Sequence, residues 1–353
     1  MTNPDIHILR YDSKYKESIL SLLGYLWRDL DETQQRELFT WRYLQNPFTT
    51  NPVIYLAIHQ DRVIGFRGFV VHHFVKGQSE PFPVYSPADT IIHPDYRGKG
   101  LFYRLNQSFF EDVQFPGMNK GIILNLSSNE QSTPLNLKQG WQATDGLKRF
   151  GLRFSFRNTL LIRSGLGNAE WPKTSSIQGR GFQIGIGNTP RTAELAAFYL
   201  RNRPQNRLTL LRNASFYRWR YDDESGCYRF VYHYRHGELT GYLIIKKLSN
   251  TQYLLWEYAA INPQVLRRMI NKAIQKLRIP FLRTWVLSAN DSKWLWKCGF
   301  VAPPTRLWQL LGKIRLPVLV RPVKERYQEE DFILEGLDIR SIENWQLFLS
   351  DRH

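Results

Sequence analysis

The chain has 353 residues, which is enough for two domains or one large one. Its hydrophobic fraction of 42% and aromatic fraction of 14% suffice to build packed cores. No apolar run approaches the roughly 18 residues that cross a membrane, and residues 1–10 lack the charged-then-apolar pattern of a signal peptide. Cys227 and Cys298 have no metal-binding spacing. We therefore expect no metal site, no transmembrane segment and a cytoplasmic location.

The formal net charge is +17, from 48 Lys and Arg against 31 Asp and Glu. Such a charge favours anionic partners. Basic residues lie widely over the second half, between Arg201 and Lys276, where they could bind an anionic polymer. No nucleic-acid-binding motif accompanies them, so we expect a solvated basic surface and no nucleic acid partner.

Strands and helices alternate along the first part of the chain. We expect a strand over 5–10, an amphipathic helix over 13–27, and a helix that carries Trp41-Arg42-Tyr43 and ends before Asn46-Pro47. Strands follow near 53–59, 62–73 and 83–92, then a helix over 98–114, a strand near 120–125 and a helix over 129–138. This alternation predicts an α/β fold with a mixed sheet.

The segment after the strand 83–92 is rich in glycine and positive charge. Gly98 and Gly100 allow the backbone to approach a ligand closely. The first turn of the helix that follows leaves N–H groups unpaired, and Arg97 and Lys99 add full positive charge beside them. The pattern favours a polyphosphate, but neither the G-x-x-x-x-G-K-[ST] nor the G-x-G-x-x-G motif is present. The alternative is a solvated turn that only begins a helix.

The run Arg97-Gly98-Lys99-Gly100-Leu101-Phe102 resembles the pyrophosphate motif R/Q-x-x-G-x-G/A of the GNAT superfamily of acyl-CoA N-acyltransferases. Phe102 departs from it, because the motif has a small residue there. A second similarity lies downstream, where Asn129 begins a short helix that ends at Gly140-Trp141. The resemblance implies that acetyl-CoA, or another acyl-CoA, binds in a cleft where two adjacent strands separate.

The resemblance also implies the residues of the site. Those expected to bind the cofactor are Ile91, Ile92, His93, Arg97, Gly98, Lys99, Gly100, Leu101, Phe102 and Asn129. Asp89 is the first candidate for a catalytic base and His93 the second. Asp89 could equally be a hydrogen-bonded structural residue, and His93 a capping or surface residue. Asn136 stands where the family commonly has a tyrosine acid, so the acid is not identified.

Several short sequences recur in the same order in the second half. FTWRY at 39–43 matches YRWRY at 217–221, and the hairpins that follow each contain a glycine, Gly65 or Gly241. Residues 91–94 resemble 260–263, and 138–141 resemble 297–300. We interpret these as two copies of one unit, the second degenerate because it lacks the glycine turn. Since both copies keep the WRY sequence, we interpret it as packing.

The chain therefore resembles tandem GNAT proteins, in particular a subgroup linked to surface-polysaccharide synthesis. We expect an acyl-CoA-binding domain over 1–155, a linker over 156–178, a degenerate domain over 179–312 and an extension over 313–353. The implied function is N-acyl transfer, most simply N-acetyl transfer, to a primary amine, with an amino sugar suggested by the subgroup. The alternatives are a non-catalytic acyl-CoA-binding scaffold and a protein that binds an anionic polymer through its basic second half.

Overall fold

The structure is a computed structural model that describes residues 6–112, 121–147, 149–164, 171, 174–221, 226–302 and 317–352. It divides into two compact units. Unit 1 comprises Met1–Thr144 and Val318–Arg340, and unit 2 comprises Asp145–Pro317 and Ser341–Arg352. In the described part of the chain, no helix is long and apolar enough to cross a membrane.

Unit 1 is built on a mixed sheet in the order β1-β2-β3-β4-β5-β15-β6. Its strands are β1 (His7–Arg10), β2 (Val53–His59), β3 (Arg62–Lys76), β4 (Phe82–Ile92), β5 (Ile122–Asn125), β15 (Pro317–Pro322) and β6 (Gln142–Leu147). Strands β1 to β4 are antiparallel neighbours, whereas β4 and β5 run parallel. The predicted mixed α/β sheet is thus confirmed.

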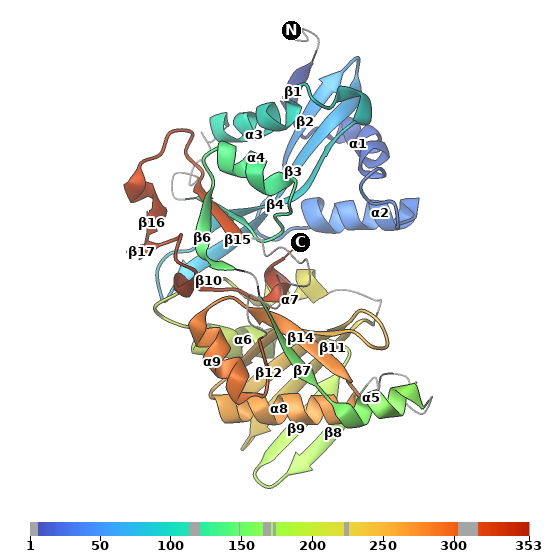
Figure 1. The fold of residues 1–353 in the computed structure, drawn as a ribbon, viewed down its shortest axis with the longest axis vertical. Coiled ribbons are helices and arrows are strands. Elements are labelled where there is room, and N and C mark those ends of the chain that lie inside the picture. The colour runs from blue at the N-terminus through green and yellow to red at the C-terminus, as the bar shows by residue number, and fades with distance from the viewer. Residues whose placement is uncertain are drawn as a thin grey trace. The chain divides into compact units, whose positions relative to one another are not determined.

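Helices cover both faces of this sheet. Helices α1 (Lys16–Leu23) and α2 (Glu32–Phe39) lie on one face, and α3 (Leu101–Glu111) and α4 (Ser132–Lys138) on the other (Figure 1). A turn of π-helix, Thr40–Leu44, continues α2 and carries the first WRY sequence. Helix α3 buries Leu101, Leu105 and Phe109, which recur every four residues and so share one face. The ring of Phe109 stacks on Phe69 of β3 at 4.2 Å.

Unit 2 repeats this plan with a sheet in the order β7-β14-β13-β12-β11-β9-β8. The strands are β7 (Arg149–Phe154), β8 (Ser175–Gly179), β9 (Phe182–Gly187), β11 (Tyr228–Arg235), β12 (Glu238–Lys247), β13 (Tyr253–Ala260) and β14 (Phe281–Val286). The helices are α5 (Phe156–Arg163), α6 (Thr192–Asn202), α7 (Ala214–Tyr221), α8 (Pro263–Lys276) and α9 (Ala289–Lys297). The apolar stripe of α8, with Leu266, Met269 and Ile270, is part of the buried core.

Glycines mark the equivalent points of the two units. Gly140 follows α4 with φ +80°, and Gly299 follows α9 with φ +82°. Each therefore holds the left-handed conformation that ends a helix at low cost for glycine alone. Gly65 and Gly241 lie in the second strand of equivalent hairpins, β2–β3 and β11–β12. The internal repeat seen in the sequence is thus present in the structure.

The unit boundaries differ from the expected ones in two places. Strand β7, which lies inside the expected first domain 1–155, belongs to the second sheet. The segment expected to be a linker contains α5 and the start of β8. The expected extension is divided between the units. Strand β15 pairs with β5 in unit 1, with Leu319 opposite Asn125, whereas residues 341–352 belong to unit 2. The expected domain end at 312 lies outside the described residues.

Candidate functional site

Two parallel strands of unit 1 separate after a short paired stretch. Among the described residues, β4 and β5 pair only at Val84 opposite Ile122 and Tyr85 opposite Ile123. Strand β4 continues to Ile92, so its second half extends beyond the stretch that β5 borders. An unpaired strand edge leaves N–H and C=O groups available to a ligand. The sequence resemblance implied such a separation of strands.

The direction of the backbone amides on β4 follows from its other neighbour, β3. The amide of His93 donates to the carbonyl oxygen of Ile64 at 2.8 Å. Hydrogen bonding alternates along an antiparallel strand, so the amides of Ile92 and Thr90 point away from β3, towards the side that β5 has left. The amide of Ile92, a predicted cofactor contact, therefore faces the opening. The amide of His93, also a predicted contact, is already used within the sheet.

The glycine turn lies at the end of this open edge. Gly98 and Gly100 have φ of +75° and +72°, and no heavy atom lies within 4 Å of where a Cβ would stand on either residue. Space for a ligand therefore remains above the turn. Arg97 and Lys99 are exposed beside it; Arg97 donates from Nε to the carbonyl oxygen of Ile92 at 3.3 Å, and Lys99 lies 4.8 Å from the ring of Tyr96.

Helix α3 begins directly after Gly100 and directs its unpaired first-turn amides to the same place. Leu101 is buried beneath the helix, and Phe102 is half-buried. The turn thus combines backbone donors, a helix dipole and two basic side chains. This arrangement suits a phosphate group.

Asn129 and the helix that follows it take the predicted arrangement. The side chain of Asn129 accepts a hydrogen bond from the amide of Ser132 at 2.7 Å, which satisfies a donor at the start of α4. Contact between Asn129 and a cofactor stays a prediction. Asn136 is 1% exposed within α4, and its Oδ1 has no partner among the described residues. An amide there cannot serve as a proton donor in the way that a tyrosine does.

Asp89 is buried and strongly bonded. Its Oδ1 accepts a hydrogen bond from Trp27 Nε1 at 3.2 Å, and its Oδ2 accepts from Tyr43 Oη at 2.8 Å and pairs with Arg42 at 2.5 Å. The residue lies where the register between β3 and β4 shifts, opposite Gly68. These three donors occupy most of the acceptor sites of the carboxylate. The bonding favours a role in fixing the irregular backbone of β4.

His93 lies at the junction of the open strand edge and the glycine turn. Its Nδ1 accepts a weak hydrogen bond from the amide of Asp95 at 3.4 Å, which caps the short helical turn Pro94–Tyr96. The ring packs edge-on against Tyr25 at 5.5 Å. The side chain is 13% exposed. These contacts agree with the capping alternative, and a catalytic role stays a prediction.

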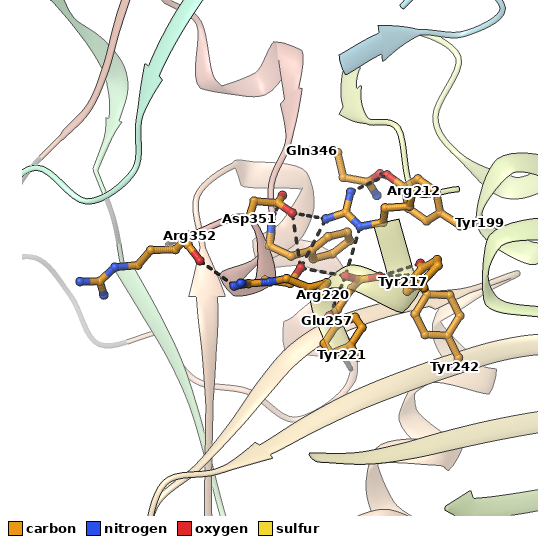
Figure 2. Close-up of polar contacts among 12 residues, drawn as sticks. Tyr199, Arg212, Tyr217, Arg220, Tyr221, Tyr242, Glu257, Gln346, Asp351 and Arg352 are labelled. Carbon is orange, nitrogen blue, oxygen red and sulfur yellow. Dashed lines mark hydrogen bonds and ion pairs between the residues drawn. The ribbon is translucent and has the colours of Figure 1, made fainter. Parts of the chain in front are cut away.

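Unit 2 holds a carboxylate in a place equivalent to that of Asp89. Glu257 of β13 is fully buried at the register shift between β12 and β13 (Figure 2). Tyr221, the equivalent of Tyr43 in the second WRY sequence, donates to it at 3.2 Å. Tyr217 and Tyr242 donate at 2.8 Å each. In both units, therefore, the tyrosine of WRY anchors a buried carboxylate on the irregular strand, which supports the structural interpretation of the repeat.

The Glu257 cluster also binds the C-terminal segment of the chain. Arg212 pairs with Glu257 at 3.2 Å and with Asp351, while Ser350 donates to Glu257 at 2.8 Å (Figure 2). Burial would raise the pKa of Glu257, but the charge of Arg212 and the hydroxyl hydrogen bonds outweigh this effect and hold its pKa below the usual range. Burial raises the pKa of Asp351 despite the same arginine. Arg212 thus compensates two buried carboxylates.

Unit 2 keeps the separation of strands but not the glycine turn. Among the residues that the structure describes, β13 and β14 pair only at Tyr253 opposite Leu282 and Leu254 opposite Arg283. The hydroxyl of Thr284 then donates to the carbonyl oxygen of Leu255 at 2.9 Å and so occupies part of the opening. Helix α8 starts at Pro263, directly after its cap Asn262. The features that suit a phosphate are therefore found in unit 1.

No protein-family model matches the sequence, and no curated protein matches it significantly. Solved structures of similar fold exist. A probable N-acyltransferase of unknown function from Enterococcus faecalis is 11% identical over 93% of this chain and 74% of its own, with a TM-score of 0.65. A GCN5-related N-acetyltransferase from Anabaena variabilis is 10% identical over 90% and 73%, with a TM-score of 0.59. A tandem GNAT protein of the clavulanic acid biosynthesis pathway is 12% identical over 90% and 98%, with a TM-score of 0.54. The chain is thus folded as two GNAT-like units.

Sequence reasoning missed one residue beside the opening. Arg67 of β3 is buried opposite Thr90 of β4. The only signal was its position, as a single charged residue inside the otherwise apolar stretch 63–71. Long charged residues are seldom fully buried unless they are paired.

Proposed function

We propose that unit 1 is an acyl-CoA-dependent N-acyltransferase. The observation that carries the proposal is the open edge of β4, which leads directly to an accessible glycine turn at the start of α3. An extended polar chain fits along the amides of the open edge of β4, and a pyrophosphate fits at the glycine turn. The fold similarity to N-acetyltransferases supports this assignment.

Acyl-CoA would supply the acyl group as an activated thioester. The amides of Thr90 and Ile92 would bind its pantetheine arm, and the first-turn amides of α3, with Arg97 and Lys99, would bind its phosphates. Asp89, held by Trp27 and the WRY residues, keeps the strand irregularity in place. Asp89 and His93 remain our candidates for accepting a proton from the attacking amine. For Asp89 the bonding favours a positioning role, because three donors already bind its carboxylate.

The acceptor in this proposal is a small primary amine. The narrower assignment to an amino sugar depends on the sequence resemblance alone. Asn136, buried where the family commonly has a tyrosine, favours one competing function, an acyl-CoA-binding protein without turnover. Release of free thiol from acetyl-CoA over a panel of amines distinguishes the two. Tight binding without thiol release on any amine would establish the scaffold.

The first experiment is a calorimetric titration with acetyl-CoA of the wild type and two variants. Gly100→Trp fills the space above the turn. Gly181→Trp is the matched control, because Gly181 also has φ +72° and no heavy atom within 4 Å of where a Cβ would stand, but lies in unit 2. We expect micromolar binding by the wild type and the control, and none by Gly100→Trp. Failure of the wild type to bind would reject the proposed function.

A further inference from the structure

Helix α5 of unit 2 carries large apolar side chains that are exposed to solvent. Phe156 and Leu160 are 78% and 51% exposed, and Phe154, the last residue of β7, is 71% exposed. Phe156 and Leu160 are four residues apart, so they are neighbours on the surface of the helix. The ring of Phe154 packs on that of Phe281 at 4.6 Å. Single exposed apolar residues are ordinary on proteins, whereas a group gathered on one element points to a contact surface.

The opposite side of α5 fixes which face is turned outward. Asn158 is buried, and its Nδ2 donates to the carbonyl oxygens of Ile274 and Ile279 at 2.9 Å each. These bonds hold α5 against the end of α8 (Figure 1). Because Asn158 faces the core, Phe156 and Leu160 on the other side of the helix point away from it.

Basic side chains surround the exposed apolar pair. With 3.6 residues per turn, Arg163 lies beside Phe156 at one edge of the outward face, and Arg157 lies beyond Leu160 at the other. Both arginines are exposed, as is Lys276 in the last turn of α8. No ion pair among the described residues includes any of these three cations. Long basic side chains extend past apolar neighbours, so their charges can reach a surface that also covers the apolar pair.

The sequence around α5 contains no negative charge. Residues 146–169, which include β7 and α5, contain five Lys and Arg, and residues 258–290, which include α8 and β14, contain six. Neither stretch contains Asp or Glu. The two stretches are neighbours in the fold, because β14 pairs with β7 from Phe281 opposite Phe154 to Val286 opposite Arg149. An anionic partner is therefore attracted here, and no acidic residue of either stretch repels it.

We propose that this face of unit 2 binds the surface of an anionic lipid membrane. We call it the α5 patch, and it comprises Phe154, Phe156, Arg157, Leu160, Arg163 and Lys276. The apolar side chains would enter the boundary between headgroups and acyl chains, while the basic ones would contact the headgroup phosphates. Leu160 favours lipid over nucleic acid, because an aliphatic side chain cannot stack on bases as an aromatic ring does. The proposal is independent of acyl transfer in unit 1.

Flotation of the full chain with lipid vesicles tests the proposal. The probes are vesicles of phosphatidylcholine alone and vesicles of equal parts of phosphatidylcholine and phosphatidylglycerol. We expect the wild type to bind the anionic vesicles far more strongly than the neutral ones, and binding to weaken with added salt because exposed charges are screened. Equal binding to both kinds of vesicle, or no binding to the anionic ones, would overturn the proposal.

Two variants separate the apolar contribution from the charged one. Phe156→Gln removes an exposed ring, and Arg157→Gln combined with Arg163→Gln removes the flanking charges. Each arginine near an anionic membrane surface contributes about 1 kcal/mol. We expect each variant to lose at least about tenfold in affinity for the anionic vesicles.

Matched controls change the same kinds of residue elsewhere in unit 2. Ile261→Gln alters an apolar side chain that is 47% exposed directly after β13, at the opposite end of the sheet from α5. Arg201→Gln combined with Arg235→Gln removes two exposed arginines outside the α5 patch. Both controls should bind nearly as well as wild type. Losses as large as those of the α5 patch variants would show that net charge alone causes binding, and would overturn the assignment to this face.

Two further readouts complete the test. Because the substituted side chains are exposed, every variant should keep the Tm of wild type, and a marked fall for Phe156→Gln would show that this ring packs within the fold. A single-stranded RNA homopolymer is the competing probe. Binding of RNA that is lost in the double arginine variant, without binding to anionic vesicles, would identify a nucleic-acid face and overturn the lipid proposal.

Discussion

Substitution of Arg212 by methionine tests the strongest energetic claim about unit 2. Arg212, Glu257 and Asp351 have side chains at most 1% exposed, and the arginine is the cation that faces both carboxylates. Arg212→Met would leave two buried negative charges beside each other without compensation. Removing one partner of a buried ion pair costs about 3–5 kcal/mol. For a domain of 150–250 residues, each kcal/mol lowers Tm by about 2–4 °C, so we expect a fall of about 6–20 °C.

The pH dependence of this loss has a definite sign. In the wild type, Arg212 and the hydroxyl groups hold the pKa of Glu257 down. Without Arg212, burial dominates and the folded-state pKa of each carboxyl rises above its unfolded value. Stability of the variant is then retained at low pH and lost as the pH rises through the raised pKa values. The Tm difference from wild type should therefore be smaller at pH 5 than at pH 8.

Calorimetry or denaturant unfolding of the single and triple variants measures the effect. Arg212→Met combined with Glu257→Gln and Asp351→Asn removes all three charges and should recover part of the lost stability, because no uncompensated carboxylate remains. A single variant within about 0.5 kcal/mol of wild type, or a triple variant less stable than the single one, would show that the cluster does not act through charge compensation.

Two further predictions concern individual side chains. Asp89→Asn should lower kcat/KM for acetyl transfer and destabilise unit 1, since Arg42 loses its ion-pair partner. The pH at which the rate is half-maximal should not move. Loss of the acidic limb of the pH–rate profile would instead show that Asp89 accepts the proton. Cys298 should react with a thiol reagent far more slowly than Cys227 at pH 8, because burial raises the pKa of Cys298 to about 11 whereas Cys227 is half-buried. Equal rates for the two thiols would contradict the packing of the segment after α9.

Local sequence signals predicted the backbone geometry around the candidate site. The positive φ of Gly98 and Gly100, the cap at Asn129 and the left-handed Gly140 all depend on neighbours a few residues away, so a short motif suffices to predict them. The repeated sequences likewise predicted two units. The exact start of α3 and the early end of α1 at Leu23 were less predictable, since helix ends depend on caps and packing.

Features that depend on distant pairing were not predictable. The bonds from Tyr43 to Asp89 and from Tyr221 to Glu257 join residues 46 and 36 positions apart, and they form because a register shift turns each carboxylate towards the helical segment. The pairing of β15 with β5 has no local signal either. Arg67 looked like an ordinary strand residue, because burial of a charge is decided by what covers it.

The division of residues 318–352 between the two units has a consequence for biosynthesis. Strand β15 borders β5 in unit 1, and Ser350 and Asp351 complete the charge cluster of unit 2. A nascent chain that has not yet emerged beyond residue 317 therefore contains neither finished sheet nor finished cluster, and the edge of β5 stays open to other strands. Domains usually fold one after another as they leave the ribosome. Here unit 1 completes its sheet, and unit 2 its charge cluster, only after the same late segment has been synthesised.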